Sequence, residues 1–245
     1  MSKPMGPIPP GFAADADGRL LIGGRRADAL VEAAGGTPLF VYDLGMVDQR
    51  IARFRETFPG VDLHYAMKAN PYEPLLKHIS KKVDGLDLAS GGELRLAVNA
   101  GSDPAAMSFA GPGKRDEELR AAIAAGVTLN CESEGEVERA LGIDRRARLA
   151  VRVNPPFEIK GSGMRMGGGA KPFGVDAERV AVLVRRILDA GADWRGFHIF
   201  AGSQALDAGA LIEAQRATVA LAAELAAAAG APPPLVNLGG GVGIP

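Results

Sequence analysis

The sequence has little cysteine, no long hydrophobic run and almost no net charge. Its 245 residues include a single cysteine, Cys131, which excludes an intrachain disulfide framework and fits a reducing compartment. No apolar stretch reaches the roughly 20 residues that span a bilayer, and the Pro- and Gly-rich start lacks the features of a secretory signal. The formal net charge of −1 gives no electrostatic reason to expect a nucleic-acid or membrane partner. We therefore expect a soluble, cytoplasmic protein with neither kind of partner.

Short β-rich runs alternate with longer segments of helical period, and 47% of the residues are hydrophobic, which is enough for one large core. Strands separated by helices indicate repeated βαβ units and a parallel sheet. The strands are predicted at 61–67, 85–89, 107–110, 127–131, 149–153, 196–200 and 235–238. The helices are predicted at 46–57, 74–81, 92–100, 116–125, 134–141, 177–190 and 208–229.

Two of these helices have a start signal. Ser90 and Glu93, and likewise Ser133 and Glu136, have the S-x-x-E spacing of a capping box, in which each side chain bonds the other residue's backbone. Both pairs support the helix boundaries given above.

The fold class is α/β, and both a (β/α)8 barrel and a doubly wound sheet fit alternating βα units. The typical barrel length of about 250 residues favours the barrel. Only seven inner strands are recognisable, however, and the sequence stops just after the seventh, at 239–245. We therefore expect a barrel that is truncated before strand eight, formed by 37–245. The segment 1–36 has no place in the strand series and is expected to pack on a part of the protein further along the chain.

Polar and glycine residues follow the predicted strands, where a barrel carries its catalytic groups. Lys68 follows the first strand directly. A lysine in a site of low dielectric constant loses proton affinity, and its neutral amine can form a Schiff base with a carbonyl compound. The alternative is a solvated lysine at a strand end, because lysine is mostly exposed. Other strand ends carry Asp87, Glu132 and Asn154.

Two glycine-bearing strand ends could hold an anion. Gly239, Gly240 and Gly241 follow the last strand, where successive backbone N–H groups can face a phosphate. Gly202 and Ser203 add a hydroxyl donor after the sixth strand. A glycine triplet also serves as a flexible turn, so this motif alone is weak.

The ordered series of motifs resembles the diaminopimelate/ornithine decarboxylase family, the fold-type III pyridoxal enzymes. The resemblance covers roughly 37–245. The motifs are Tyr65-Ala-Met-Lys-Ala-Asn70, Leu86-Asp-Leu-Ala-Ser-Gly-Gly-Glu-Leu94, Val151-Arg-Val-Asn-Pro155, Lys171-Pro-Phe-Gly174, Gly202-Ser-Gln204 and Asn237-Leu-Gly-Gly-Gly241.

The resemblance implies an alanine racemase-like barrel with a C-terminal β-domain, pyridoxal 5'-phosphate as cofactor and a role for each matching residue. Lys68 would form the Schiff base, and Ser203 with Gly239–Gly241 would hold the phosphate. Asp87 and Arg152 match positions close to the cofactor and its lysine. Glu93 matches as well, but its spacing equally fits a helix start. No metal ion is implied.

Two features depart from the family pattern. The family usually has a histidine stacked on the pyridine ring two residues before the Gly-Ser pair, and here that position is Phe200, while His198 matches an earlier histidine. Phenylalanine can stack but cannot donate a proton or carry charge. The glycine-rich loop 160–174 is similar to a subgroup associated with carrier-protein-tethered substrates or exosortase gene clusters; its glycines also fit a solvated loop.

The activity implied is α-decarboxylation of an amino acid, free or carrier-bound, by a homodimer of the full-length protein. One alternative is an amino-acid racemase, which would share the barrel and the lysine; the motifs around Asp87 and Ser203 favour the decarboxylase. The other is a non-catalytic barrel that binds a partner, against which Lys68 argues. Cys131 and Trp194 are expected to be packing residues.

Overall fold

The computed structural model describes residues 11–158, 163–165, 167–169 and 171–243. In this part of the chain, seven strands form one parallel sheet in the order β13-β11-β8-β7-β6-β5-β4. These strands are β4 (His64–Ala66), β5 (Gly85–Leu88), β6 (Met107–Phe109), β7 (Thr128–Cys131), β8 (Arg148–Asn154), β11 (Asp193–Ile199) and β13 (Val236–Asn237). Each corresponds to a predicted strand, although the first and last are shorter than expected. A two-residue strand, β10 (Val175–Asp176), adds to β8.

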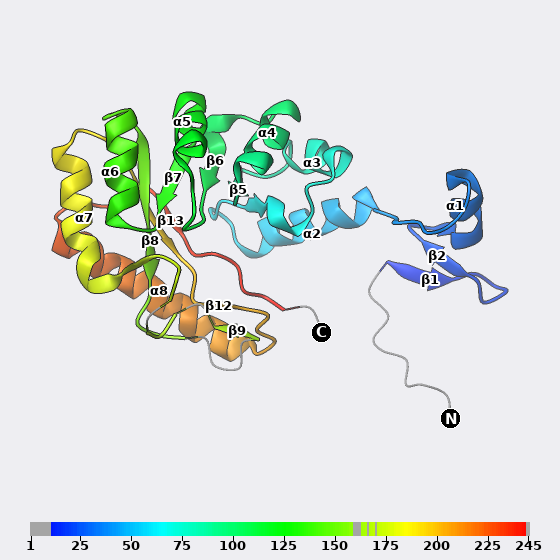
Figure 1. Ribbon diagram of the computed structural model, residues 1–245. Coiled ribbons are helices and arrows are strands. Elements are labelled where there is room, and N and C mark those ends of the chain that lie inside the picture. The colour runs from blue at the N-terminus through cyan, green and yellow to red at the C-terminus, as the bar shows by residue number, and fades with distance from the viewer. Residues whose placement is uncertain (1–10, 159–162, 166, 170, 244–245) are drawn as a thin grey trace.

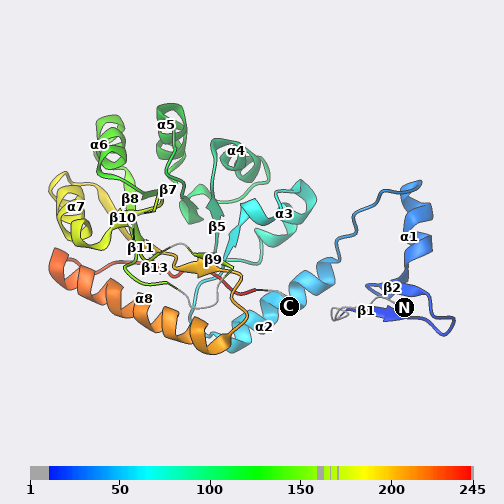
Figure 2. The ribbon, with the colours of Figure 1, turned by 60° about the horizontal axis from the view of Figure 1, so that its bottom comes forward.

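Helices cover the outer face of the sheet (Figure 1). They are α3 (Glu73–Ile79), α4 (Gly91–Asn99), α5 (Asp116–Ala125), α6 (Glu134–Ile143), α7 (Ala177–Asp189) and α8 (Ala208–Ala229). Helix α2 (Leu44–Thr57) precedes them and lies beside α3, with none of its residues buried. Figure 2 shows α3 to α8 in an arc around the strands, so that the sheet curls into part of a barrel. The predicted barrel is confirmed in this open form, with β4 and β13 at the two ends of the strand order.

Side chains alternate along the strands between an apolar outer set and a polar inner set, because successive residues of a strand point to opposite faces. The outer set packs under the helices; its buried members include Leu86, Leu88, Met107, Phe109, Leu129, Cys131, Leu149, Val151, Val153, Phe197 and Ile199. The inner set is Asp87, Ser108, Asn130, Arg152, Asn154 and His198, with His64 and Asn237 on the end strands. The fold thus places its polar residues inside the barrel.

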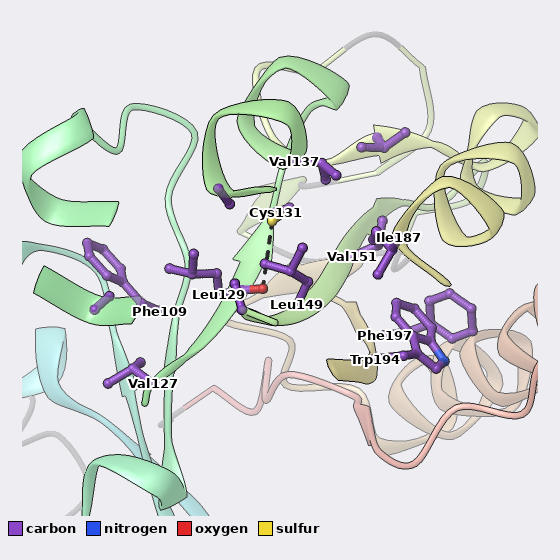
Figure 3. Close-up of a cluster of buried hydrophobic side chains, with 14 of the residues drawn as sticks. Phe109, Val127, Leu129, Cys131, Val137, Leu149, Val151, Ile187, Trp194 and Phe197 are labelled. Atoms are coloured by element: carbon purple, nitrogen blue, oxygen red, sulfur yellow. Dashed lines mark hydrogen bonds between the residues drawn. The ribbon is translucent and has the colours of Figure 1, made fainter. Parts of the chain in front are cut away.

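The core lies between the sheet and its helices, as the close-up in Figure 3 shows. Helix α7 contributes Val180, Leu183, Val184 and Ile187, whose i, i+3, i+4, i+7 spacing forms one apolar face. Cys131 is fully buried, which confirms its packing role.

The start of β11 is also buried in this core. Trp194 meets Phe197 edge to face, with ring centroids 5.2 Å apart, as expected of a packing residue.

The helix starts that were predicted at Ser90 and Ser133 are present, with one correction. Each serine hydroxyl accepts from the backbone N–H three residues on, at Glu93 and Glu136. The returning carboxylate, however, bonds the backbone N–H of the residue before the serine: Glu93 accepts from Ala89, and Glu136 from Glu132.

A small unit precedes the barrel, and sequence reasoning assigned no structure to it. Strands β1 (Phe12–Ala14), β2 (Leu20–Ile22) and β3 (Arg25–Arg26) form an antiparallel sheet, followed by α1 (Ala27–Ala34). In Figures 1 and 2 this unit lies beside the amino end of α2, away from the strands of the barrel. The Asp15 carboxylate forms its turn by accepting from the backbone N–H groups of Asp17 and Arg19. In the described residues, no helix is long and apolar enough to cross a membrane.

The last strand, β13, approaches its neighbour β11 closely at a glycine of β11. Gly196 has φ +105°, and the pairing of β11 with β8 is irregular between Trp194 and Gly196. A Cβ at Gly196 would lie 1.9 Å from the carbonyl oxygen of Leu235, where the chain enters β13. Only glycine therefore allows β13 to approach β11 here.

We expect the Gly196→Ala substitution to weaken the attachment of β13 and to lower the free energy of unfolding of the full-length protein. Gly191→Ala is the matched control, because Gly191 also has a positive φ, +79°, but no atom lies within 4 Å of its added Cβ. Both variants lose stability because alanine disfavours a positive φ. In Gly196→Ala alone, the clash of the new Cβ with the Leu235 carbonyl should lower the free energy of unfolding by about 1–3 kcal/mol more. Denaturant unfolding measures the difference; equal losses in the two variants would contradict the close approach.

Candidate functional site

Lys68 lies one residue into a single turn of 3-10 helix, η1 (Met67–Ala69), that follows β4. The sequence predicted a strand up to residue 67, so the short turn is a correction. Met67 is fully buried and anchors the turn, and the Tyr65 hydroxyl donates to the carbonyl of Asn70 at 2.9 Å. The Lys68 side chain is thus presented from a well-supported turn at the carboxyl end of the sheet.

The Lys68 amine faces the aromatic ring of Phe200, which directly follows β11. Its Nζ atom lies 5.9 Å from the ring centroid, within the range of a cation–π contact. The backbone of Gly239 approaches the same ring, since a Cβ there would lie 2.4 Å from Phe200 Cδ2. Three strand ends that are far apart in sequence therefore meet at Lys68, Phe200 and Gly239.

Asp87 projects from β5 into the barrel and accepts three side-chain hydrogen bonds. Its Oδ1 accepts from His64 Nδ1 at 3.1 Å and from the Ser108 hydroxyl at 2.8 Å. Its Oδ2 accepts from Asn237 Nδ2 at 3.0 Å. Burial alone would raise the pKa of Asp87, but the hydrogen bond and charge of His64 outweigh it and hold that pKa at about 2. The same bond raises the pKa of His64, since the carboxylate stabilises the protonated imidazole.

His198 lies next to this pair on β11, opposite Arg152 of β8 in the strand register. Burial, and then the positive charge of Arg152, lower the pKa of His198 to about 4. The imidazole is therefore neutral near neutral pH. Its Nδ1 atom is buried and has no hydrogen-bond partner among the described residues, so it is available to a ligand.

Arg152 is clamped by Glu132, which follows β7. Arg152 Nη1 donates to Glu132 Oε1 at 3.0 Å, and only 10% and 1% of the two side chains are exposed. Glu132 also accepts from the backbone N–H groups of Gly111 and Gly174. The Phe173 ring covers the guanidinium, with 5.0 Å between Arg152 Cζ and the ring centroid. One buried carboxylate thus joins Arg152 to two loops at the carboxyl end of the sheet.

The two glycine-bearing strand ends lie side by side. Ala205 N donates to the carbonyl of Gly241 at 2.9 Å, and Gly243 N donates to the carbonyl of Ala205 at 2.8 Å. Ser203 lies in β12 (Gly202–Ser203), which pairs with β9 (Met164–Arg165) of the glycine-rich loop. The loop after β8 therefore reaches the strand end that carries Ser203.

The structure brings most of the predicted site residues together. Lys68, Asp87, Arg152, His198, Phe200 and Gly239 all lie at the carboxyl end or on the inner face of the sheet. Glu93 serves the start of α4, as its capping spacing indicated. Part of the loop 160–174, at 160–162, 166 and 170, lies outside the described residues. In the described residues, no group of three or more His, Cys, Asp or Glu side chains could hold a metal ion.

Sequence reasoning assigned no role to His64, Glu132 or Asn237. His64 lies two residues before Ala66, which pairs with Asp87, and therefore shares the inner face of the sheet. The strand period of two could have shown this. The bond between Asn237 and Asp87 spans 150 positions, and no local pattern could have shown it.

These features define a βα barrel with an amine, an aromatic ring and a glycine turn at the carboxyl end of its strands. Residues 44–245 match the family described as "Pyridoxal-dependent decarboxylase, pyridoxal binding domain". The chain belongs to this family, and its cofactor is pyridoxal phosphate.

Curated relatives agree with this assignment. The chain is 31% identical over 216 residues to the L-glutamyl-[BtrI acyl-carrier protein] decarboxylase of Niallia circulans, covering 85% of this chain and 50% of that one. It is 34% identical over 237 residues to the diaminopimelate decarboxylase of Aquifex aeolicus, covering 93% of this chain and 56% of that one. The chain thus spans about half the length of the curated relatives it matches.

Solved structures share the fold. The diaminopimelate decarboxylase of M. jannaschii in complex with L-lysine superposes with a TM-score of 0.85 at 28% identity, covering 96% of this chain and 58% of that one. An SrLDC mutant in complex with PLP superposes with a TM-score of 0.77 at 27% identity, covering 90% of this chain and 57% of that one.

The residues present fit pyridoxal phosphate. Lys68 provides an amine for the aldehyde, and Phe200 provides an apolar face beside that amine. His198 has an unpartnered buried nitrogen among the described residues, and the position of a Cβ on Gly240 is open space. A polar cofactor with a phosphate group would use each of these features.

We expect Glu132→Ala to destabilise the full-length protein by about 3–5 kcal/mol, because it leaves the guanidinium of Arg152 buried without its partner. Glu134→Ala is the control: Glu134 pairs with Arg179 at the surface, where both side chains are about half exposed, and its loss should cost less than about 1 kcal/mol. Denaturant unfolding measures both changes. Similar small losses would show that Glu132 does not carry the buried charge of Arg152.

We expect His198 to make the cofactor-free, full-length protein less stable in acid. Its folded pKa of about 4 lies below the ordinary value of about 6.5, so the unfolded chain binds the proton more tightly. Stability should therefore fall as the pH decreases from about 6.5 towards 4, by up to about 3 kcal/mol from this group. His198→Gln removes this contribution, and unfolding measured from pH 7 to 4 should show a shallower loss. An unchanged slope would contradict a neutral His198.

Proposed function

We propose that the full-length protein catalyses pyridoxal phosphate-dependent α-decarboxylation of an amino acid, with Lys68 as the attachment point of the cofactor. The observation that carries the proposal is the position of the Lys68 amine, 5.9 Å from the centroid of the Phe200 ring at the carboxyl end of the sheet. Family membership over residues 44–245 and the decarboxylases among its relatives support the same activity.

The cofactor, when bound, supplies an electron sink for the bond to the departing carboxylate. Lys68 supplies the amine that binds the aldehyde and later holds or returns a proton at its Nζ atom. Phe200 provides a stacking face in place of the family's histidine, without a proton or charge to contribute. His198 provides a neutral imidazole at the same site.

Two charged groups set the electrostatics around Lys68. Asp87 is ionised and paired with His64, so it contributes a fixed negative charge inside the barrel. Arg152, held by Glu132, contributes a fixed positive charge next to His198. We assign both residues to the catalytic site because preorganised charges cost no reorganisation during the reaction.

The phosphate group of the cofactor is assigned to Ser203 and to the turn formed by Gly239, Gly240 and Gly241. This assignment is supported by the hydrogen bond between Ala205 and Gly241, which places the two strand ends beside each other. Glycines allow the backbone N–H groups to approach an anion closely.

The substrate class is a diaminopimelate-like or carrier-tethered amino acid. The Aquifex relative is a diaminopimelate decarboxylase, and the Niallia relative is a decarboxylase of a glutamyl carrier protein. The antiparallel pairing of β9 with β12 brings the glycine-rich loop to the site, where it could contact a tethered substrate.

We further propose that residues 1–36 pack on a C-terminal β-domain and that the full-length protein works as a homodimer in the cytoplasm. The open strand order between β4 and β13 and the position of the small sheet of β1 to β3, away from the strands of the barrel, support the domain proposal. The single, buried cysteine is compatible with a reducing compartment.

We expect Lys68→Ala to abolish the absorbance of lysine-bound cofactor in the full-length protein and to reduce decarboxylation by several orders of magnitude. Lys77→Ala is the control, since Lys77 is an exposed lysine paired with Glu73 on α3. Absorption spectroscopy after addition of pyridoxal phosphate measures the first effect. If full-length protein shows no lysine-bound cofactor, or if Lys68→Ala keeps it, the proposal fails.

Carbon dioxide release tests the reaction itself. The panel should contain diaminopimelate, ornithine, lysine, arginine and carrier-bound glutamate, with the full-length protein and with its Lys68→Ala variant as the blank. Release from at least one amino acid by the unmodified protein alone is expected. Conversion of an L- to a D-amino acid without carbon dioxide would instead identify a racemase.

A further inference from the structure

We propose that Asn237 is a positioning residue that shapes the glycine turn for the phosphate group, and that Asp87 holds Asn237 in the orientation this requires. The inference rests on the proposed function, since it concerns the same phosphate site. It assigns a role to a side chain that does not itself need to touch the cofactor.

Asn237 has one hydrogen bond at each end of its amide. Its Oδ1 accepts from the backbone N–H of Gly239 at 2.8 Å, and its Nδ2 donates to Asp87 Oδ2 at 3.0 Å. The first bond closes an Asx turn, in which the Asn237 side chain accepts from the backbone N–H two residues further on, and that residue is the first glycine of the triplet. The second bond ties this turn to β5, which lies next to the end strand β4 on the far side of the sheet order from β13.

The charge of Asp87 decides which way the amide points. An ionised carboxylate only accepts hydrogen bonds, whereas an amide can present either its oxygen or its NH2 group. Asp87 stays ionised, since its pKa is held at about 2. The NH2 group must therefore face Asp87, which leaves the amide oxygen facing the N–H of Gly239.

Asp87 is itself fixed by the residues around it. The imidazole of His64 and the hydroxyl of Ser108 both donate to Oδ1, so Oδ2 is left for Asn237. Asn130 Nδ2 donates to the Ser108 hydroxyl at 2.9 Å and thereby orients its proton towards Asp87. The orientation of Asn237 thus depends on four strands of the barrel.

The turn that results leaves backbone donors for an anion. Gly239 has φ +65° and uses its N–H in the Asx turn. In the described part of the chain, no recorded hydrogen bond uses the N–H of Gly240 or Gly241. Gly240 is exposed, and its Cβ position is open space. A flipped Asn237 amide would set its NH2 group against the N–H of Gly239, and the turn would open.

Binding of two ligands to the full-length protein tests this role. Pyridoxal lacks only the phosphate group of pyridoxal phosphate, and both ligands have the aldehyde that reacts with Lys68. We expect Asn237→Ala to weaken binding of pyridoxal phosphate by roughly 5- to 10-fold, the effect of one or two hydrogen bonds, and to leave pyridoxal binding unchanged. The ratio of the two dissociation constants is the readout, because a general loss of structure would weaken both ligands alike.

Two further variants sharpen the test. Asn154→Ala is the matched control, since Asn154 is also an asparagine of the inner face but donates to the carbonyl of Gly169 and to Asp176, not to Asp87 or the turn; its ratio should stay at the unmodified value. The exchange Asp87→Asn with Asn237→Asp keeps the net charge and restores an amide donor facing a carboxylate. It should recover part of the ratio that Asn237→Asp alone loses by setting two carboxylates against each other.

The outcomes separate the inference from the proposed function. If the unmodified protein binds pyridoxal and pyridoxal phosphate equally, the glycine turn does not hold the phosphate, and the assignment under the proposed function fails. If the unmodified protein prefers pyridoxal phosphate but Asn237→Ala keeps the same ratio, the turn holds the phosphate without Asn237 and the inference is overturned. An exchange variant that recovers nothing would remove Asp87 from the inference.

Discussion

The hydrogen bonds accepted by the Asp87 carboxylate are the interactions on which the arrangement of polar side chains inside this barrel depends. A charge in a confined space must be met by donors, and here His64, Ser108 and Asn237 converge on it from three other strands. Through Asp87, His64 of β4 is linked to Asn237 of β13, although these two strands stand at the two ends of the strand order and do not pair with each other. The hydrogen bonds to Asp87 also make the interior polar and ordered before any ligand arrives.

Side chains alternate along each strand, so that the residues that form the core and the residues that line the site lie on opposite faces of the sheet. Outward residues such as Leu129, Leu149 and Phe197 are fully buried under the helices and form the core. Many inward polar side chains bond one another, as Asp87 does with His64 and Ser108, whereas His198 Nδ1 has no partner among the described residues. Because the two sets point to opposite faces, the site can be rich in charge without breaking into the apolar packing.

Much of the architecture followed from local patterns. The βα alternation predicted every strand of the parallel sheet except the two-residue β10, and the helices between them, since the period changes from two to 3.6 at each boundary. The strand ends that carry Lys68, Asp87 and Glu132 were recognisable from the strand pattern, whereas Arg152 was identified from the family motif. The sheet of β1 to β3 was not predicted, since its strands have only two or three residues each and almost no buried side chain. The turn η1 was also missed, since one turn of 3-10 helix has no period of its own.

The sequence by itself determined the fold class, the lysine, and the family, because these depend on periodicity and on the order of short motifs. It also showed that Phe200 stands where the family usually has histidine. Only the tertiary structure decided that Phe200 faces Lys68, that Glu132 clamps Arg152 and that Asp87 orients Asn237. The physical reason is that these contacts join residues of different strands, and the contact of Asp87 with Asn237 needs the curvature of the whole sheet, because β5 and β13 do not pair.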